Sequence, residues 1–233
     1  MNQRRNEYNQ PIGEEVSDWE KRKFPTDMCY VGKHTIVKRL SHIHIKDLYS
    51  AYKVSSPSNW TYLPEEYPKD YEEFEQTFLK KIENTETIFY VVLNKETNKP
   101  LGTFSLMRID PENGVIEVGH VNFSDALKRT RMSTEAHQLL ATYVFEELQY
   151  RRYEWKCDSL NAPSIQTAKR LGFTYEGTFR NAVIYKHRSR DTSWFSMLIE
   201  EWPIHKKAFT QWLAEENFDE KGVQIKKLES CKQ

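Results

Sequence analysis

The sequence has few cysteines, no long hydrophobic run and no excess of either charge. Cys29, Cys157 and Cys231 are widely and irregularly spaced, which fits neither a disulfide framework nor a zinc site built from closely paired ligands. No apolar stretch approaches the roughly 20 residues that a membrane span requires, and the first residues lack the apolar segment of a signal peptide. We therefore expect a cytoplasmic protein with reduced thiols, no bound metal and no membrane partner.

Opposite charges balance, with 34 Lys and Arg against 34 Asp and Glu. A formal net charge of zero leaves no global field that would attract nucleic acid, so any anion site must be local. The 12 Phe, 13 Tyr and 6 Trp supply side chains large enough for a core. At 233 residues the chain is long enough for one domain with extensions. We expect an N-terminal extension at 1–30, the domain at 31–203, and a C-terminal helix with a frayed tail at 204–233.

Hydrophobic periodicity alternates between the spacing of strands and that of helices. From Tyr71 to Ile82 the apolar residues recur at three and four positions, as on one face of a helix. Strands are predicted at 34–40, 88–93, 101–109, 115–123, 153–157, 173–185 and 191–199, and further helices at 133–150, at 161–172 and up to about residue 213. This order predicts an α/β (α+β) fold with a mixed, largely antiparallel central sheet flanked by helices.

The helix predicted at 161–172 has the clearest boundaries. Asn161 is a strong N-cap residue, Pro163 stands in the first turn, and Gly172 is placed to end the helix in the left-handed conformation. The surrounding motif comprises Asn161-Ala162-Pro163-Ser164, Ala168-Lys169-Arg170-Leu171-Gly172-Phe173 and Glu176-Gly177. It is extended by Glu117-Val118-Gly119-His120, Thr134-Glu135-Ala136, Tyr153-Glu154 and Arg190-Asp191-Thr192-Ser193-Trp194.

In this order, these residues resemble the GNAT acetyltransferases and, more narrowly, their Rim-type branch of protein N-terminal acetyltransferases. The resemblance extends over roughly residues 35–203. It implies the acyl-CoA N-acyltransferase (GNAT) fold, acetyl-CoA as cosubstrate, and an amine acceptor that is a protein N-terminus or a small molecule. An altered phosphate loop leaves a second interpretation open, a catalytically silent acyl-CoA-binding module. We expect a monomer or a homodimer in either case.

Transfer of an acetyl group to an amine needs a base, a group that stabilises the oxyanion, and help for the departing thiolate. Glu117 is the candidate base, because its apolar neighbours Ile116 and Val118 turn its side chain to the opposite face of their strand. The alternative is an ordinary solvated glutamate. The resemblance implies that the backbone N–H groups of Gly119 to Phe123 face the thioester.

Ser164 is the candidate donor to the thiolate of coenzyme A. Many members of the family use a tyrosine one turn later, where this sequence has Ala168. Asn161 is grouped with the catalytic residues because the family uses it to hold the pantetheine arm. The alternatives are a serine and an asparagine that only cap the helix.

Coenzyme A is expected to contact the end of the strand at 115–123 and the start of the following helix, where free N–H groups attract phosphate. The family usually has glycine where this sequence has Arg129 and Arg131. The cofactor-binding candidates are His120, Val121, Phe123, Arg129, Arg131, Met132, Ser133, Thr134, Asn161 and Ser164. Trp60, Tyr62 and Tyr185 are candidates for the acceptor cleft, with core packing as the alternative.

Overall fold

The computed structural model describes residues 4–26 and 28–232 and is built on one eight-stranded sheet. The strand order is β1-β2-β3-β4-β5-β6-β8-β7. Neighbouring strands are antiparallel except for β5 and β6, which are parallel, so the predicted mixed, largely antiparallel sheet is confirmed. The strands are β1 (Cys29–Val31), β2 (Thr35–Arg39), β3 (Ile88–Asn94), β4 (Pro100–Asp110), β5 (Val115–Phe123), β6 (Arg152–Asp158), β7 (Thr174–Tyr185) and β8 (Arg188–Leu198).

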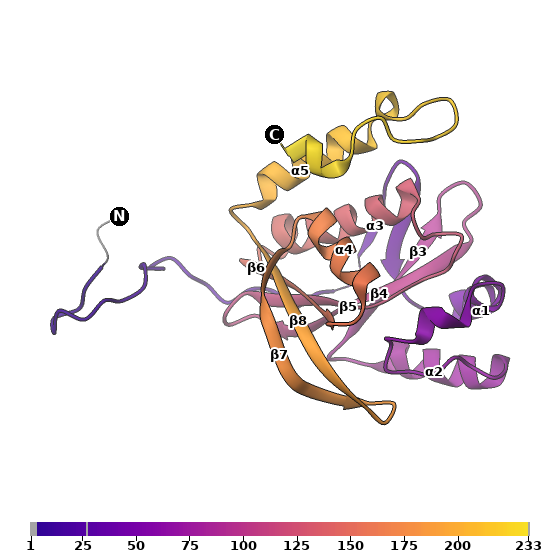
Figure 1. The fold of residues 1–233 in the computed structure, drawn as a ribbon, viewed down its shortest axis with the longest axis horizontal. Coiled ribbons are helices and arrows are strands. Elements are labelled where there is room, and N and C mark those ends of the chain that lie inside the picture. The colour runs from indigo at the N-terminus through magenta and orange to yellow at the C-terminus, as the bar shows by residue number, and fades with distance from the viewer. Residues whose placement is uncertain (1–3, 27, 233) are drawn as a thin grey trace.

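Helices lie on both faces of this sheet (Figure 1). The α-helices are α1 (Ile45–Lys53), α2 (Tyr71–Glu83), α3 (Arg131–Thr142), α4 (Ala162–Leu171) and α5 (Trp202–Leu213). A π-helical turn at Tyr143–Glu147 continues α3, and short 3-10 helices lie at His42–His44, Pro57–Trp60, Glu215–Asn217 and Leu228–Lys232. In the part of the chain that the structure describes, no helix has both the length and the apolar character needed to cross a bilayer.

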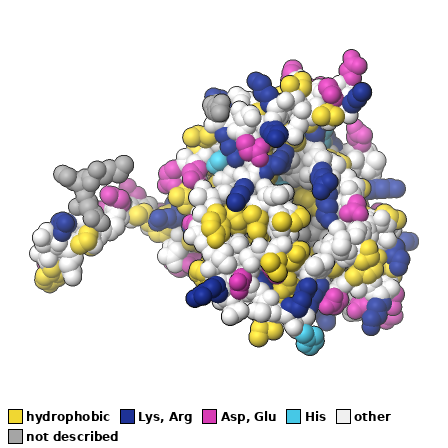
Figure 2. Space-filling model, viewed as in Figure 1, with side chains coloured by type: hydrophobic (Ala, Val, Ile, Leu, Met, Phe, Trp, Pro, Cys, Tyr) yellow, Lys and Arg dark blue, Asp and Glu magenta, His cyan; other side chains and the backbone are white. Residues whose placement is uncertain are grey.

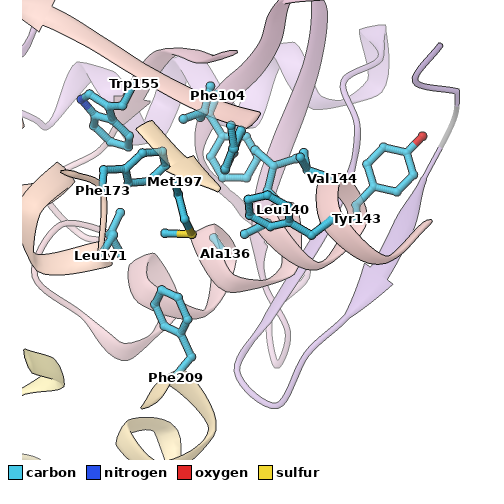
Figure 3. Packing of buried hydrophobic residues seen from close by; sticks show 14 of the residues in the cluster. Phe104, Ala136, Leu140, Tyr143, Val144, Trp155, Leu171, Phe173, Met197 and Phe209 are labelled. Atoms are coloured by element: carbon cyan, nitrogen blue, oxygen red, sulfur yellow. The ribbon is translucent and has the colours of Figure 1, made fainter. Parts of the chain in front are cut away.

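Side-chain alternation along the strands divides the core into two clusters. On β3, Tyr90 faces the cluster that includes α3, α4 and α5, whereas Phe89 faces α1 and α2. The first cluster brings together residues from helices and strands that are distant in sequence (Figure 3): Phe104, Ala136, Leu140, Tyr143, Val144, Trp155, Leu171, Phe173, Met197 and Phe209. Burial of each large apolar side chain contributes roughly 1.5–3 kcal/mol to stability. The two clusters therefore fix both layers of helices against the sheet.

Two predicted helix boundaries are confirmed by their hydrogen bonds. The Asp70 side chain accepts a bond from the Glu73 backbone N–H at 2.9 Å, which starts α2. At the end of α4, Gly172 is left-handed with φ 114°. The N–H groups of Gly172 and Phe173 both donate to the carbonyl of Ala168, at 3.2 and 3.0 Å. The left-handed glycine therefore provides hydrogen-bond donors for a carbonyl of the last turn of the helix.

Two other predicted boundaries are wrong. The helix expected at 133–150 begins at Arg131, because the Thr130 side chain caps it by accepting from the Ser133 N–H at 3.2 Å. Its regular part ends at Thr142. The strand expected at 191–199 begins at Arg188, since Lys186 and His187 have φ values of 48° and 56° and form a tight two-residue hairpin turn.

The C-terminal tail does not fray, contrary to the sequence prediction. Leu228 and Cys231 are buried in the larger core cluster. The Asn217 side-chain amide donates to the carbonyls of Trp212 and Lys226 at 3.0 and 3.1 Å, which ties the segment back to α5. The tail was predicted to fray because it is highly charged. Two apolar residues within it nevertheless pack into the core and hold it against the domain.

The N-terminal segment extends away from the body of the molecule before the chain enters the domain (Figure 1). The Trp19 indole donates to the carbonyl of Glu112 at 2.6 Å, and its ring fills the space beside Gly114. Residues Cys29–Val31 then add the outer strand β1. The domain boundaries at 30 and 203 stay predictions.

We expect Gly172→Ala to destabilise the protein by roughly 1–3 kcal/mol. Alanine resists a φ of 114°, and its Cβ would lie 2.5 Å from the His205 ring of α5. Urea unfolding measures the loss. Gly13→Ala is the matched control, because a Cβ there meets nothing within 4 Å. Equal stabilities of the two variants would contradict this account of the end of α4.

Candidate active site

The parallel strands β5 and β6 pair over only part of their length. Among the described residues their pairing ends at Val118 and Trp155, although β5 continues to Phe123 and β6 to Asp158. The edge of β5 that faces β6 is therefore left without a strand partner beyond this point.

A β-bulge in β5 lies at the start of this opening. Thr103 of β4 pairs with Asn122, whereas Ser105 pairs with Gly119, so β5 has an extra residue between the two pairs. His120 lies in the bulge with φ 48°. A bulge bends its strand and increases the local twist, and this bend accounts for the separation of β5 from β6.

Glu117 is buried immediately before the opening. Its side chain is only 6% exposed, and its Oε2 lies 2.9 Å from Lys156 Nζ and 3.3 Å from Arg108 Nε. Ile116 and Val118 point into the core on the opposite face, as their alternation predicts. Burial and ion pairing rule out the alternative of a solvated strand glutamate.

Glu117 is one end of a row of alternating charges. Lys156 Nζ also lies 2.6 Å from Glu154 Oε2. Arg152 continues the row, with its Nε 2.7 Å from Glu154 and its terminal nitrogen 2.5 Å from Glu176. Because Glu154 and Lys156 alternate with apolar residues, both lie on the same face of β6 as Arg152. Each buried carboxylate at this end of the sheet thus has a cation beside it.

Burial raises the pKa of Glu117 above its ordinary value, although the charges of Lys156 and Arg108 act in the opposite direction. A carboxylate with a raised pKa is a stronger base than a solvated one. Lys156 limits this rise, because a neighbouring cation favours the ionised form. Glu117 therefore combines increased basicity with an ion pair that keeps it ready to accept a proton.

Ser164 lies on the other side of the opening, in the first turn of α4. Its Oγ accepts a hydrogen bond from the Trp155 indole N–H at 3.0 Å. Since an indole nitrogen only donates, the serine keeps its own hydrogen for another acceptor. Burial raises the pKa of the nearby Cys157 thiol, although Ser164 acts in the opposite direction. That thiol is therefore a packing residue rather than a nucleophile.

Asn161 caps α4, as predicted. Its Oδ1 accepts a hydrogen bond from the Ser164 N–H at 3.2 Å. Ala168, one turn after Ser164, is fully buried and has no hydroxyl. In this helix the indole of Trp155 therefore bonds to the hydroxyl of Ser164.

The two arginines of the predicted phosphate site lie at the start of α3, Arg129 just before the helix and Arg131 as its first residue. Arg129 is left-handed, with φ 59°, a conformation that glycine adopts more readily and that agrees with the glycine expected here. Arg131 turns towards the C-terminal segment instead, where its guanidinium lies 3.5 Å from the centre of the Phe218 ring. The two arginines therefore differ in their surroundings: Arg129 has a left-handed backbone, whereas Arg131 lies against Phe218.

The remaining loop candidates are held by internal contacts. Ser133 Oγ donates to the carbonyl of Thr130 at 2.8 Å, and Thr134 Oγ1 accepts from Arg170 at 3.1 Å. Met132 is half-buried against the larger core cluster. An anion at this turn would therefore bind to the backbone N–H groups at the start of α3.

The side chains of the candidates on β5 are held by contacts within the protein. Phe123 is buried in the larger core cluster, and Val121 packs against it. His120 Nδ1 lies 3.8 Å from Glu65 Oε1. Burial lowers the pKa of His120, and Lys81 lowers it further, so the imidazole is neutral at pH 7. These residues can serve a thioester through their backbone N–H groups, as the resemblance implied.

Two of the three acceptor candidates are hydrogen-bonded to the end of β6 and to the loop that follows it. Tyr62 OH donates to the carbonyl of Leu160 at 3.1 Å, and Tyr185 OH donates to Asp158 Oδ2 at 2.8 Å. Trp60 is a core residue, only 4% exposed. It nevertheless borders a pocket of about 330 Å³ between the segment after α1 and the β7–β8 hairpin. This pocket is lined by Pro57, Trp60, Thr61, Glu66, Tyr67, Lys186 and Arg188.

Sequence analysis missed the groups that tune these candidates. Lys156, Arg108 and Trp155 were not singled out, although Glu154 and Lys156 alternate with apolar residues along one short strand. That alternation indicated a charged strand face. It gave no indication that Glu117 lies opposite, because the pairing of β5 with β6 brings together segments about 40 residues apart.

Comparison with known proteins gives consistent results. A family model described as an acetyltransferase (GNAT) domain matches residues 38–174. The crystal structure of a GCN5-related N-acetyltransferase from Brucella melitensis is 39% identical, with a TM-score of 0.91 over 93% of this chain and 99% of that one. The uncharacterized N-acetyltransferase p20 of Bacillus licheniformis is 34% identical over 117 residues, which are 48% of this chain and 63% of that protein.

A third similarity concerns the branch of the family. The putative ribosomal N-acetyltransferase YdaF of Bacillus subtilis is 30% identical over 105 residues, which are 45% of this chain and 57% of that protein. This agrees with the resemblance to the Rim-type branch. The family model covers more than half of the chain, and the Brucella melitensis structure matches nearly all of it. The chain therefore belongs to the GNAT family and is an N-acetyltransferase.

Proposed function

We propose that this enzyme transfers the acetyl group of acetyl-CoA directly to a primary amine. The observation that best supports this is the placement of Glu117 and Ser164 on opposite faces of the sheet at the β5–β6 opening. A thioester in the opening has a base on one side and a hydroxyl donor on the other. This arrangement suits attack from one face and departure of the sulfur towards the other.

The proposed reaction begins with removal of a proton from the acceptor ammonium by Glu117, directly or through a water. The amine nitrogen then attacks the thioester carbon, the C–N bond forms, the C–S bond breaks, and coenzyme A leaves as a thiolate. Backbone N–H groups of Gly119–Phe123 stabilise the charge on the carbonyl oxygen. Ser164 donates a hydrogen bond to the sulfur. The nitrogen, positively charged after its attack, gives up a second proton, which reaches the thiolate through water, and the first proton passes from Glu117 to solvent.

The start of α3 supports binding of the pyrophosphate of acetyl-CoA. A helix N-terminus has free N–H groups and positive potential, and Arg129 supplies a cation in the adjoining left-handed residue. Asn161 would hold the pantetheine arm at the start of α4, beside the hydroxyl of Ser164.

Glu117→Gln is expected to lower kcat by about 10²- to 10⁴-fold at neutral pH, because an amide cannot accept the proton. Thiol release from acetyl-CoA with a panel of peptides and small amines measures turnover. Thermal stabilisation by acetyl-CoA should be unchanged. Glu112→Gln is the control, since that carboxylate is exposed on the β4–β5 turn. Normal turnover of Glu117→Gln would exclude it as the base.

The same assay tests the silent-module alternative. An enzyme releases thiol with at least one amine of the panel. Stabilisation of the wild-type protein by acetyl-CoA, without thiol release for any amine, would instead identify a binding module and contradict the proposed reaction.

Ser164→Ala is expected to lower the single-turnover rate by about 10- to 100-fold, the usual effect of losing a hydrogen bond to a charged atom. Rapid-quench measurement of acetyl transfer isolates this step. Thr167→Ala removes a hydroxyl of the same helix that donates only to the Pro163 carbonyl, and should leave the rate unchanged. If both variants react at the wild-type rate, Ser164 is only a capping residue.

Lys156→Met should move the acidic limb of the kcat/KM profile to higher pH. The ammonium opposes the burial that raises the pKa of Glu117, so its removal raises that pKa further, and a higher pH is needed to ionise the base. Lys21→Met, at an exposed ion pair with Glu112, is the control. An unshifted limb in Lys156→Met would show that another group sets it.

A further inference from the structure

Three polar side chains of β8 lie in a row on the face that carries Glu117. Arg190, Thr192 and Trp194 alternate along the strand with residues of the opposite face. Trp194 pairs in register with Lys156, whose ammonium lies 3.7 Å from the centre of the Trp194 ring and 2.9 Å from Glu117. The row therefore begins beside the candidate base and runs away from it along β8.

Each residue of this row has a buried polar atom without a hydrogen-bond partner among the described residues. These atoms are Arg190 Nε, Thr192 Oγ1 and Trp194 Nε1. Buried polar atoms in folded proteins are almost always hydrogen-bonded, so successive exceptions indicate an absent water or ligand. Two of the three are obligatory donors. These two donors would each be satisfied by an oxygen acceptor.

Arg190 has no carboxylate within ion-pair distance in the described part of the chain. The nearest acidic residue by register is Asp158, opposite Thr192. Its two oxygens already accept hydrogen bonds, from Tyr185 OH at 2.8 Å and from the Leu160 N–H at 2.9 Å. The guanidinium thus keeps an uncompensated charge, and a carboxylate of a ligand would compensate it with strong hydrogen bonds.

The entrance to the row is basic. Lys186 and Arg188 belong to the same hairpin, and the sequence has no acidic residue between positions 180 and 190. Lys186 Nζ lies 3.3 Å from Glu66 Oε2, whereas Arg188 has no carboxylate within ion-pair distance among the described residues. Figure 2 shows basic side chains around the free end of this hairpin. Lys186 and Arg188 donate to the carbonyls of Trp60 and Thr61, each at 2.7 Å, which holds the hairpin end over the pocket described above. This charge favours an anionic acceptor over a cationic one.

We propose that the acceptor is a peptide N-terminus with an acidic side chain near its amine, and that Arg190, with Thr192 and Trp194, binds this peptide. The inference rests on the proposed function. Arg190 and Trp194 are about 14 Å apart along the strand, at about 3.4 Å per residue. With the amine at Glu117, an extended peptide reaches Arg190 with the side chain of its second or third residue. A free amino acid, whose carboxylate is two bonds from its amine, is too short.

The experiment compares two peptides that differ in one atom group. Acetyl transfer to Ala-Glu-Ala-Ala-Gly-Gly and to Ala-Gln-Ala-Ala-Gly-Gly, both with amidated C-termini, is followed by thiol release. We expect kcat/KM of the wild-type enzyme to be about 10- to 100-fold higher for the glutamate peptide, mainly through KM, as for a hydrogen-bonded charge. Equal values would overturn the proposal, and this comparison needs no variant.

Variants then assign the preference to Arg190. Arg190→Gln should reduce the glutamate preference to less than about threefold, because the loss of this cation removes most of the expected selectivity. Arg180→Gln is the control, because Arg180 is exposed on the neighbouring strand β7. A glutamate preference that survives in Arg190→Gln would show that another cation binds the carboxylate. If Arg190→Gln unfolds, Arg190→Lys replaces it and should retain part of the preference.

Two further outcomes separate this proposal from the one on which it rests. Thiol release with small amines, at equal rates for the two peptides, contradicts acidic-peptide recognition and leaves the acetyl transfer intact. Absence of thiol release with every amine contradicts the transfer itself. Better turnover of free glutamate than of the glutamate peptide would overturn the assignment to a peptide.

Discussion

The separation of β5 from β6 is the constraint on which the rest of the site depends. Parallel strands normally continue side by side, because each gains backbone hydrogen bonds from the other. Here the pairing ends at Val118 and Trp155, and the bulge at His120 turns β5 away. The backbone groups that lose their partners become available to a ligand. The opening also connects the two faces of the sheet, so that groups on opposite faces can act on one molecule.

Charge compensation makes burial of Glu117 possible. An isolated carboxylate in an apolar environment costs several kcal/mol and tends to become protonated. The row from Glu117 through Lys156 and Glu154 to Arg152 gives each carboxylate a cation at 2.6 to 2.9 Å. Such a row keeps charge inside the protein without a large net field.

Segments outside the central motif complete the site. The β7–β8 hairpin reaches the segment after α1 through Lys186 and Arg188. The C-terminal segment packs under Arg131 through Phe218 and inserts Leu228 into the core. The C-terminal segment is therefore packed against the domain and is not an independent appendage.

The sequence by itself determined the family and most of the elements, but it predicted neither β1 nor α1. Asn161, Gly172 and Asp70 mark helix ends because their effects are local, and the alternation around Glu117 assigned it to the face opposite the core. It did not reveal that Lys156 pairs with Glu117, that Trp155 holds Ser164, or that Arg131 turns to Phe218. Those contacts join residues far apart in the chain, and only the tertiary structure decided them, because the register between strands sets which side chains meet. Helix capping and hydrophobic periodicity act over a few residues, whereas the contacts of a site depend on how distant segments pack together.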